Sequence, residues 1–235
     1  MITEILNLYR EHFNYKNFYN ILLTRILNNP DHYIDSKQLL SEYEFSKQIS
    51  LPDNILTEVG DTRVDLPIWF GNPNSTNRII ILGMEPRDSD KSGRLNIERV
   101  GNNVFATPFA LERKSGPYYS AFKEIIYQSD VFVYFTDIVK FYDVRVNKKS
   151  DDRNARKTFP VRARNQLSFL KEEISIIQPE KIISLGNLSY NFSNKYLIEH
   201  ELLSSNSNIL IKVRHPSNGG ALIARDQIRA IFNQL

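Results

Sequence analysis

The fold is decided by the stretch Ile79-Ile80-Ile81-Leu82-Gly83-Met84-Glu85-Pro86. Its four aliphatic residues in a row are typical of a strand that is buried on both faces. Gly83 and Pro86 are residues that end such a strand. Three later apolar runs, at 131–135, 182–185 and 209–213, also lead into polar residues, glycine or proline. The sequence therefore predicts four buried strands.

Longer amphipathic segments lie between and after these strands. They predict helices over 117–128, 162–177, 188–198 and 221–233. Alternation of strand and helix is typical of parallel strands joined by right-handed crossovers, with helices on both faces of the sheet. We predict an α/β fold, in which residues 78–235 form a three-layer α/β/α domain around a central four-stranded parallel sheet.

The first 77 residues have a different pattern. Apolar residues recur at helical spacing over 5–13 and 18–26, and a third helix is predicted over 36–43. Proline and asparagine in 51–77 indicate an irregular connector. We expect residues 1–77 to form a helical extension that packs on the main domain.

The composition excludes several classes of protein. The chain has no cysteine, which excludes disulfides, thiolate zinc sites and iron–sulfur clusters held by cysteine. Its four histidines lack metal-ligand spacing, so we expect no metal and no cofactor. The apolar stretches are too short to span a bilayer, and the N-terminus lacks a signal-peptide pattern. We expect a cytoplasmic monomer without membrane contact.

Positive charge is concentrated in one part of the chain. The 30 basic and 27 acidic residues nearly balance, but residues 140–164 hold nine basic residues against three aspartates. Such a run is most simply a solvated loop, and the alternative is contact with nucleic acid.

Polar residues follow each predicted strand. The strand ends lead into Gly83-Met84-Glu85-Pro86, Thr136-Asp137, Gly186-Asn187 and His215-Pro216-Ser217. In open α/β sheets, ligands bind beyond the carboxyl ends of the strands. We therefore expect two carboxylates and a histidine to converge in one crevice.

The order of these segments carries a resemblance. The chain has no Gly-rich phosphate loop and no Gly-x-Ser-x-Gly elbow. The series Gly83 to Pro86, Phe105, Thr136 to Lys140, Ile182 to Gly186 and His215 to Ser217 resembles the uracil-DNA glycosylase superfamily, from Arg78 to the C-terminus. The resemblance implies an enzyme that flips a pyrimidine out of DNA and hydrolyses its N-glycosidic bond, leaving an abasic site.

The resemblance also implies roles for individual residues. His215 would stabilise negative charge at the pyrimidine O2, and Glu85 would stabilise the sugar cation and orient water, with Asp88 as the reserve carboxylate. Phe105 would stack on the flipped base, and Gly83 and Met84 would line its pocket. The structural alternatives are a surface carboxylate for Glu85, a buried turn histidine for His215 and a core ring for Phe105.

Two departures from the family pattern concern the base. Asp137 stands where relatives that remove uracil have asparagine, and an ionised carboxylate only accepts hydrogen bonds, as the N4 amine of cytosine requires. A protonated Asp137 would accommodate uracil again. Arg87 replaces a tyrosine that closes the space beside C5, so it could accept a polar 5-substituent or contact a phosphate. Together, Asp137 and Arg87 suggest that the excised base is a 5-substituted cytosine. By extension, the substrate would be modified viral DNA and the role antiviral defence.

The basic segment leaves the strand end beside Asp137, where it could hold the phosphate backbone. Backbone amides at the start of the last helix suit a phosphate, and a leucine there could wedge into the base stack. The DNA contacts that we expect involve Lys140, Lys148, Lys149, Arg153, Arg156, Lys157, Ser217, Asn218 and Leu222. The alternatives are a uracil-DNA glycosylase for base excision repair, a non-catalytic DNA-binding module with this fold, and a hydrolase of free nucleosides.

Overall fold

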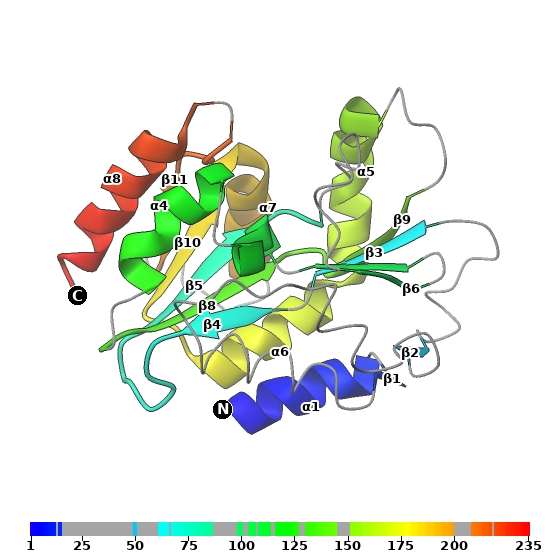
Figure 1. Ribbon diagram of the computed structural model, residues 1–235, viewed down its shortest axis with the longest axis horizontal. Helices are drawn as coiled ribbons and strands as arrows, with labels where there is room; N and C mark the ends of the chain where they lie inside the picture. Colours follow the sequence, from blue (N-terminus) through cyan, green and yellow to red (C-terminus); the bar gives the residue numbers. More distant parts are fainter. Residues whose placement is uncertain are drawn as a thin grey trace.

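The computed structural model describes residues 1–12, 14–15, 49–50, 61–65, 67–86, 98–100, 103–106, 108–113, 116–126, 130–144, 151–199, 208–217 and 219–235. At its centre lies a five-stranded sheet in the order β11-β10-β5-β8-β4 (Figure 1). The strands are β4 (Ile68–Phe70), β5 (Arg78–Gly83), β8 (Phe132–Asp137), β10 (Lys181–Leu185) and β11 (Leu210–Val213).

The four predicted strands of this sheet are confirmed. β11, β10, β5 and β8 are parallel, and the central residues of β10, β5 and β8 are buried, as strands covered on both faces require. β11 lies at the edge of the sheet and is buried only at Val213. The sheet has one strand more than predicted, because β4 pairs antiparallel with β8 at the edge. β4 has only three residues, too few to show a period in the sequence.

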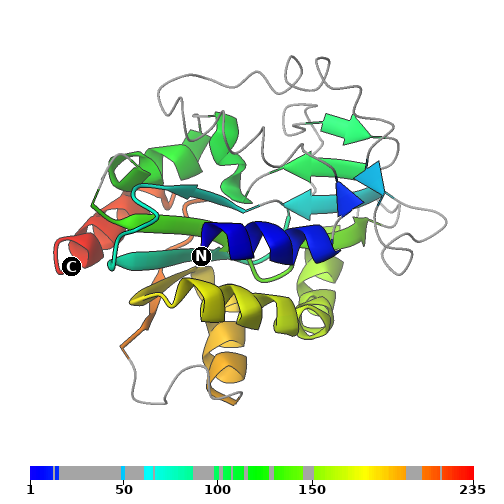
Figure 2. The ribbon, with the colours of Figure 1, turned by 90° about the horizontal axis from the view of Figure 1, so that it is seen from below.

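Helices cover both faces of this sheet, which confirms the three-layer prediction. Figure 2 shows α4 (Gly116–Ile126) and α8 (Ala221–Phe232) on one side, and α6 (Leu167–Ile177) and α7 (Gly186–Glu199) on the other. Successive residues of a strand point to opposite faces. Accordingly, Phe135 packs on Phe122 of α4, whereas Tyr134 contacts Glu173 of α6.

The helix predicted over 162–177 is wrong in its bounds. It is two helices, α5 (Asp151–Asn165) and α6, with Gln166 between them. The Gln166 side chain accepts a hydrogen bond from the Lys140 amide at 2.8 Å and donates to the Phe141 carbonyl at 2.7 Å. This residue therefore ties the helix junction to the start of β9, and a contact of that kind leaves no period in the sequence.

A second sheet, not predicted, has the order β6-β7-β3-β9 (Figure 1). Its strands are β3 (Asp61–Asp65), β6 (Glu98–Val100), β7 (Asn103–Ala106) and β9 (Phe141–Val144). β3 precedes β4 and β9 follows β8, so the antiparallel β4–β8 ribbon continues as β3–β9 beyond a bend. The basic segment 140–164 thus contains a strand and most of α5, and the reading of it as a loop is wrong.

The N-terminal helix α1 (Ile2–His12) is confirmed and lies beside α6, with Ile5, Leu8 and Tyr9 buried. The helices predicted over 18–26 and 36–43 lie outside the described residues. β1 (Asn14–Tyr15) pairs with β2 (Ile49–Ser50). In the described part of the chain, no helix combines the length and the apolar character needed to cross a membrane.

Candidate active site

The site begins where β5 and β8 end side by side. Gly83 pairs with Asp137 in the parallel register, and the Ile138 amide donates to the Gly83 carbonyl at 3.2 Å. A Cβ atom on Gly83 would lie 1.9 Å from Oδ1 of Asp137 and 2.8 Å from Cζ of Phe109. Only glycine therefore allows the Asp137 carboxyl and the Phe109 ring to lie against this strand end.

Phe109 is the aromatic ring that the structure places beside Asp137. It lies in the 3-10 helix η3 (Pro108–Arg113) with φ of 63°, a left-handed conformation that a bulky residue adopts only when its surroundings enforce it. Its ring packs on Tyr118 and Phe122, each with a centroid distance of 5.5 Å. Phe109 was not predicted from the sequence. The ring predicted to stack on the base was Phe105, whose side chain lies outside the described residues.

Asp137 is buried beside a second carboxyl group, that of Asp65. Its side chain is 3% exposed, and it accepts a hydrogen bond from the carboxyl of Asp65 at the end of β3. Two carboxyl groups can form a hydrogen bond only through a shared proton. Burial raises the pKa of Asp137 to about 6, although Asp65 and the Lys140 ammonium lower it. Asp65 is a site residue that sequence reasoning missed.

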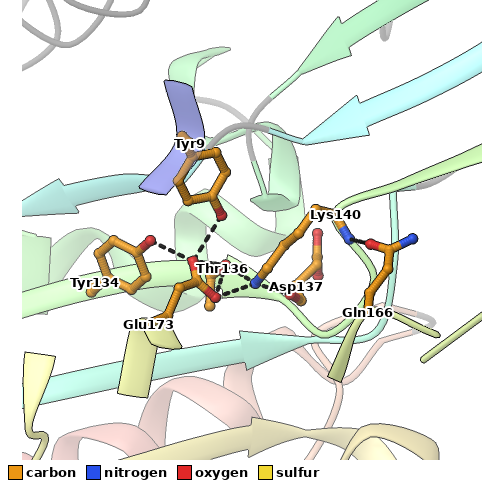
Figure 3. Close-up of polar contacts among 7 residues, drawn as sticks. All are labelled: Tyr9, Tyr134, Thr136, Asp137, Lys140, Gln166 and Glu173. Carbon is orange, nitrogen blue, oxygen red and sulfur yellow. Dashed lines mark hydrogen bonds and ion pairs between the residues drawn. The ribbon is translucent and has the colours of Figure 1, made fainter. Parts of the chain in front are cut away.

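A buried polar network lies on the other side of β8 (Figure 3). The Glu173 carboxylate accepts hydrogen bonds from Tyr9 at 2.7 Å, from Tyr134 at 2.5 Å and from Thr136 at 3.0 Å. The Lys140 ammonium pairs with Glu173 and also donates to Thr136 and to the Asp137 carbonyl. The network therefore joins α1, α6 and the end of β8 directly behind Asp137.

This network overturns one predicted DNA contact. The Lys140 side chain is 0% exposed, and burial lowers its pKa although Glu173 opposes that change. A buried ammonium that is already paired does not reach a phosphate. The prediction for Lys140 is wrong because its position, three residues after Asp137, sends the side chain back under β8 to meet Glu173.

Glu85 lies two residues beyond Gly83 and is held by an arginine. Its side chain is 4% exposed, and its Oε2 accepts hydrogen bonds from Nε of Arg162 at 3.1 Å and from Nη2 at 2.5 Å. Burial raises the pKa of Glu85 to about 7, Arg162 lowers it, and the nearby charge of Asp137 raises it. A carboxylate of this kind changes its ionisation near neutral pH, as a general base does. The sequence did not predict a contact between Arg162 and Glu85. It pointed only to the basic segment 140–164, which contains Arg162.

His215 follows β11, which is separated from β5 by β10 in the main sheet. Its Nδ1 lies 2.6 Å from the Ser217 hydroxyl and 3.3 Å from the Ser217 amide. Because a backbone N–H always donates, Nδ1 is an acceptor, and the neutral ring carries its proton on Nε2. Gly186, with φ of 82°, lies against the ring, since a Cβ there would be 3.3 Å from Cβ of His215.

An aromatic side chain connects the two halves of the site. The Tyr118 ring of α4 packs edge-on against His215, with a centroid distance of 5.6 Å, and lies tilted against Phe109, with a centroid distance of 5.5 Å. Phe109 in turn contacts Gly83 beside Asp137. These contacts link His215 to the strand end that carries Gly83 and Asp137, and the charge of Asp137 acts on Glu85. That Glu85, Asp137 and His215 serve one site stays a prediction.

The remaining residues predicted for the site differ in their exposure, and several lie outside the described residues. Lys157 on α5 is exposed, and Leu222 at the start of α8 is 63% exposed. The Ser217 hydroxyl is engaged with His215, and Met84 is half-buried against the core. Arg153 and Arg156 lie on α5, but their side chains are outside the described residues. The residues wholly outside the described ranges are Arg87, Asp88, Lys148, Lys149 and Asn218.

Comparison with known proteins agrees with this geometry. Within the described ranges, no three histidine, aspartate or glutamate side chains are grouped to hold a metal ion. The family model of the uracil DNA glycosylase superfamily matches residues 69–227, more than half of the chain and from within β4 to within α8. No curated protein matches the chain closely enough to be significant. The chain therefore belongs to the uracil DNA glycosylase superfamily, whose members act on DNA as glycosylases.

Proposed function

We propose that the protein is a monofunctional DNA glycosylase that flips a 5-substituted cytosine out of DNA and hydrolyses its N-glycosidic bond. The observation that carries the proposal is the buried Asp137 carboxyl, held over Gly83 beside the Phe109 ring. A flipped base is read by stacking on an aromatic ring and by hydrogen bonds to its Watson–Crick edge. Phe109 and Asp137 supply both contacts.

The carboxyl pair supports a cytosine-type base. The carboxyl of Asp65 donates a hydrogen bond to Asp137. Above pH 6 Asp137 is ionised, and its carboxylate can only accept hydrogen bonds from the base. The N4 amine of cytosine donates and satisfies it, whereas O4 of uracil would place two acceptors together at the cost of an unsatisfied buried group.

The reaction uses His215 and Glu85 on the two sides of the sugar–base bond. As the bond from C1′ to N1 breaks, its electron pair goes to the base, and the Nε2–H of His215 stabilises the charge at O2. Water bonds to C1′ and gives its proton to the Glu85 carboxylate. The base anion takes up a proton from solvent, so that the products are a free base and an abasic site whose C1′ carries the hydroxyl of the attacking water. Lys140, locked in its ion pair with Glu173, is not the nucleophile.

Selectivity comes from the 5-substituent. An enzyme that removed plain cytosine would destroy the genome of its own cell, so the modification must be recognised. Arg87, a flexible multiple donor, replaces the tyrosine that closes the C5 side in uracil-specific relatives. Viral DNAs that carry hydroxymethylated or glycosylated cytosine fit this site, and antiviral defence is the corresponding role. The exposed Lys157 and Leu222 would contact the phosphate backbone and the base stack.

The test is a panel of duplexes that carry uracil, cytosine, 5-methyl-, 5-hydroxymethyl- or glucosylated cytosine at one position. Alkali-induced strand breaks report abasic sites. We expect breaks at 5-substituted cytosine, and His215→Ala should lower the single-turnover rate by roughly two to three orders of magnitude, as loss of an oxyanion-type donor does.

Other outcomes of this panel point elsewhere. Breaks at uracil alone indicate a repair enzyme. Salt-dependent binding of DNA without any breaks indicates a non-catalytic module. Activity on free nucleosides, with no affinity for DNA, indicates a small-molecule hydrolase.

A further inference from the structure

Glu85 forms an ion pair with Arg162, a residue that has no part in the reaction proposed above. The two residues are 77 positions apart in the sequence, and Arg162 comes from α5, the helix that follows β9 of the second sheet. Both hydrogen bonds from the guanidinium fall on Oε2 of Glu85. No donor among the described residues lies on Oε1. The carboxylate therefore has one oxygen held by Arg162 and one left for a water molecule.

We propose that Arg162 is a positioning residue for base excision, which holds Glu85 ionised and directs its second oxygen to the attacking water. The inference rests on the proposed role of Glu85. It adds a residue that acts through another group and does not itself touch the reacting atoms.

The geometry favours this role over a simple phosphate contact. The Arg162 side chain is only 22% exposed. Its Nε and Nη2 are engaged with Glu85, and its Nη1 donates to the Thr158 hydroxyl at 2.5 Å. A guanidinium whose three nitrogens all have protein partners is fixed in orientation, as a supporting residue must be.

The electrostatics agree with the geometry. Among the described residues, two charged groups face Glu85, namely Arg162 from α5 and Asp137 from the end of β8. Burial and Asp137 both raise the pKa of Glu85, and Arg162 alone opposes them. Loss of the guanidinium would therefore leave mostly protonated Glu85 at pH 7, and a protonated carboxyl cannot accept the proton of water.

The experiment compares Arg162→Gln and Arg162→Lys with the matched control Arg164→Gln. Arg164 lies on the same helix, is exposed and donates to the Tyr196 hydroxyl at 3.1 Å, so its loss removes the same charge away from Glu85. Single-turnover excision is measured from pH 6 to 9 with enzyme in saturating excess, and DNA affinity is measured separately at two salt concentrations.

For Arg162→Gln we expect the rate at pH 7 to fall about fivefold or more, and the midpoint of the rising limb to move up by about one pH unit or more, because an adjacent opposite charge shifts a carboxyl pKa by this amount. Activity should recover at pH 9. Arg162→Lys should keep a midpoint near that of the parent, and Arg164→Gln should leave it unchanged. If Arg162→Gln does not fold, as judged by circular dichroism, a parent-like midpoint in Arg162→Lys together with a raised midpoint in Arg162→Met still supports the proposal.

An unchanged midpoint in a folded Arg162→Gln variant would overturn the inference. If its DNA affinity also fell and became less dependent on salt, Arg162 would be a phosphate contact. A parent protein that releases no base overturns the proposed function, and the role of Arg162 with it. Carbon-13 NMR of the Glu85 carboxyl, assigned with Glu85→Gln, gives the same comparison without substrate: a titration that is identical in parent and Arg162→Gln also contradicts the proposal.

Discussion

Glu85 and Asp137 are buried carboxyl groups close to each other, but their partners differ. Glu85 is held by a guanidinium and Asp137 by the carboxyl of Asp65. An arginine partner favours the ionised form, whereas a carboxyl partner requires a proton between the two groups. Two acids with environments this different can take different roles, one toward water and one toward the base.

Asp137→Asn should shift the preference of the enzyme from cytosine-type bases toward uracil. The amide supplies the donor that O4 requires, and a mismatched buried polar pair costs about 1–3 kcal/mol, so the preference should move by about tenfold or more. The measurement is the ratio of single-turnover rates on matched uracil and 5-substituted cytosine duplexes. If the ratio does not move, Asp137 does not read the base edge.

The same preference should depend on pH in the parent protein. Asp137 has a pKa raised to about 6, so it is an ionised acceptor at pH 8 and gains a proton as the pH falls below 6. A protonated carboxyl can donate to O4 of uracil. The ratio of uracil to 5-substituted cytosine excision should therefore rise as pH falls from 8 to 5.5. Glu85 serves both substrates and cancels in this ratio, so a ratio that is flat with pH contradicts the prediction.

Among the elements, the end of β8 is the one that most depends on distant parts of the chain. Thr136 and Lys140 contact Glu173 of α6, and Tyr9 of α1 contacts the same carboxylate (Figure 3). Tyr9 and Glu173, which are 164 positions apart in the sequence, thus together support the strand that carries Asp137. Each polar group of this network has a partner, which is the condition under which a buried network stabilises a fold.

Lys140→Met should strongly destabilise the protein. It leaves the Glu173 carboxylate buried without its cation, and breaking a buried pair in this way costs about 3–5 kcal/mol in the free energy of unfolding. Urea denaturation followed by circular dichroism measures the loss. The control is Arg229→Gln, which breaks the exposed pair with Glu124 and should change stability little. If Lys140→Met together with Glu173→Leu is no more stable than Lys140→Met alone, the uncompensated charge is not the cause.

The molecule as a whole consists of a main sheet that carries the site and a second sheet that continues its edge (Figures 1 and 2). α5 lies beyond the second sheet's strand β9 and supplies Arg162 to the site. One basic segment therefore combines the half-buried Arg162, paired with Glu85, with exposed residues such as Lys157. A DNA duplex held along α5 would lie next to Glu85.

Replacing Lys148, Lys149, Arg153, Arg156 and Lys157 by glutamine should weaken DNA binding equally on all sequences and flatten its salt dependence. Phosphate contacts carry no sequence information, and each one contributes about 0.9 to the slope of log affinity against log salt. Fluorescence anisotropy at four salt concentrations measures the slope. A control that replaces the exposed Lys123, Lys195 and Lys212 should change it less for each charge removed. If each charge removed changed the slope equally in both variants, the basic segment 140–164 would have no special contact with DNA.

The sequence alone predicted the four parallel strands of the main sheet, helices on both of its faces and the family, because buried strands, amphipathic helices and strand-end motifs are local patterns. It missed the edge strand β4 and the division between α5 and α6. It also predicted that Glu85, Asp137 and His215 lie at one edge, since parallel strands end together. It did not determine the partners of these residues. Arg162, Asp65 and Phe109 come from other elements, and Lys140 faces the interior through its contact with Glu173. Such pairings leave no period in the chain. They arise only when packing brings charges far apart in sequence into a low dielectric, where each buried charge requires a partner.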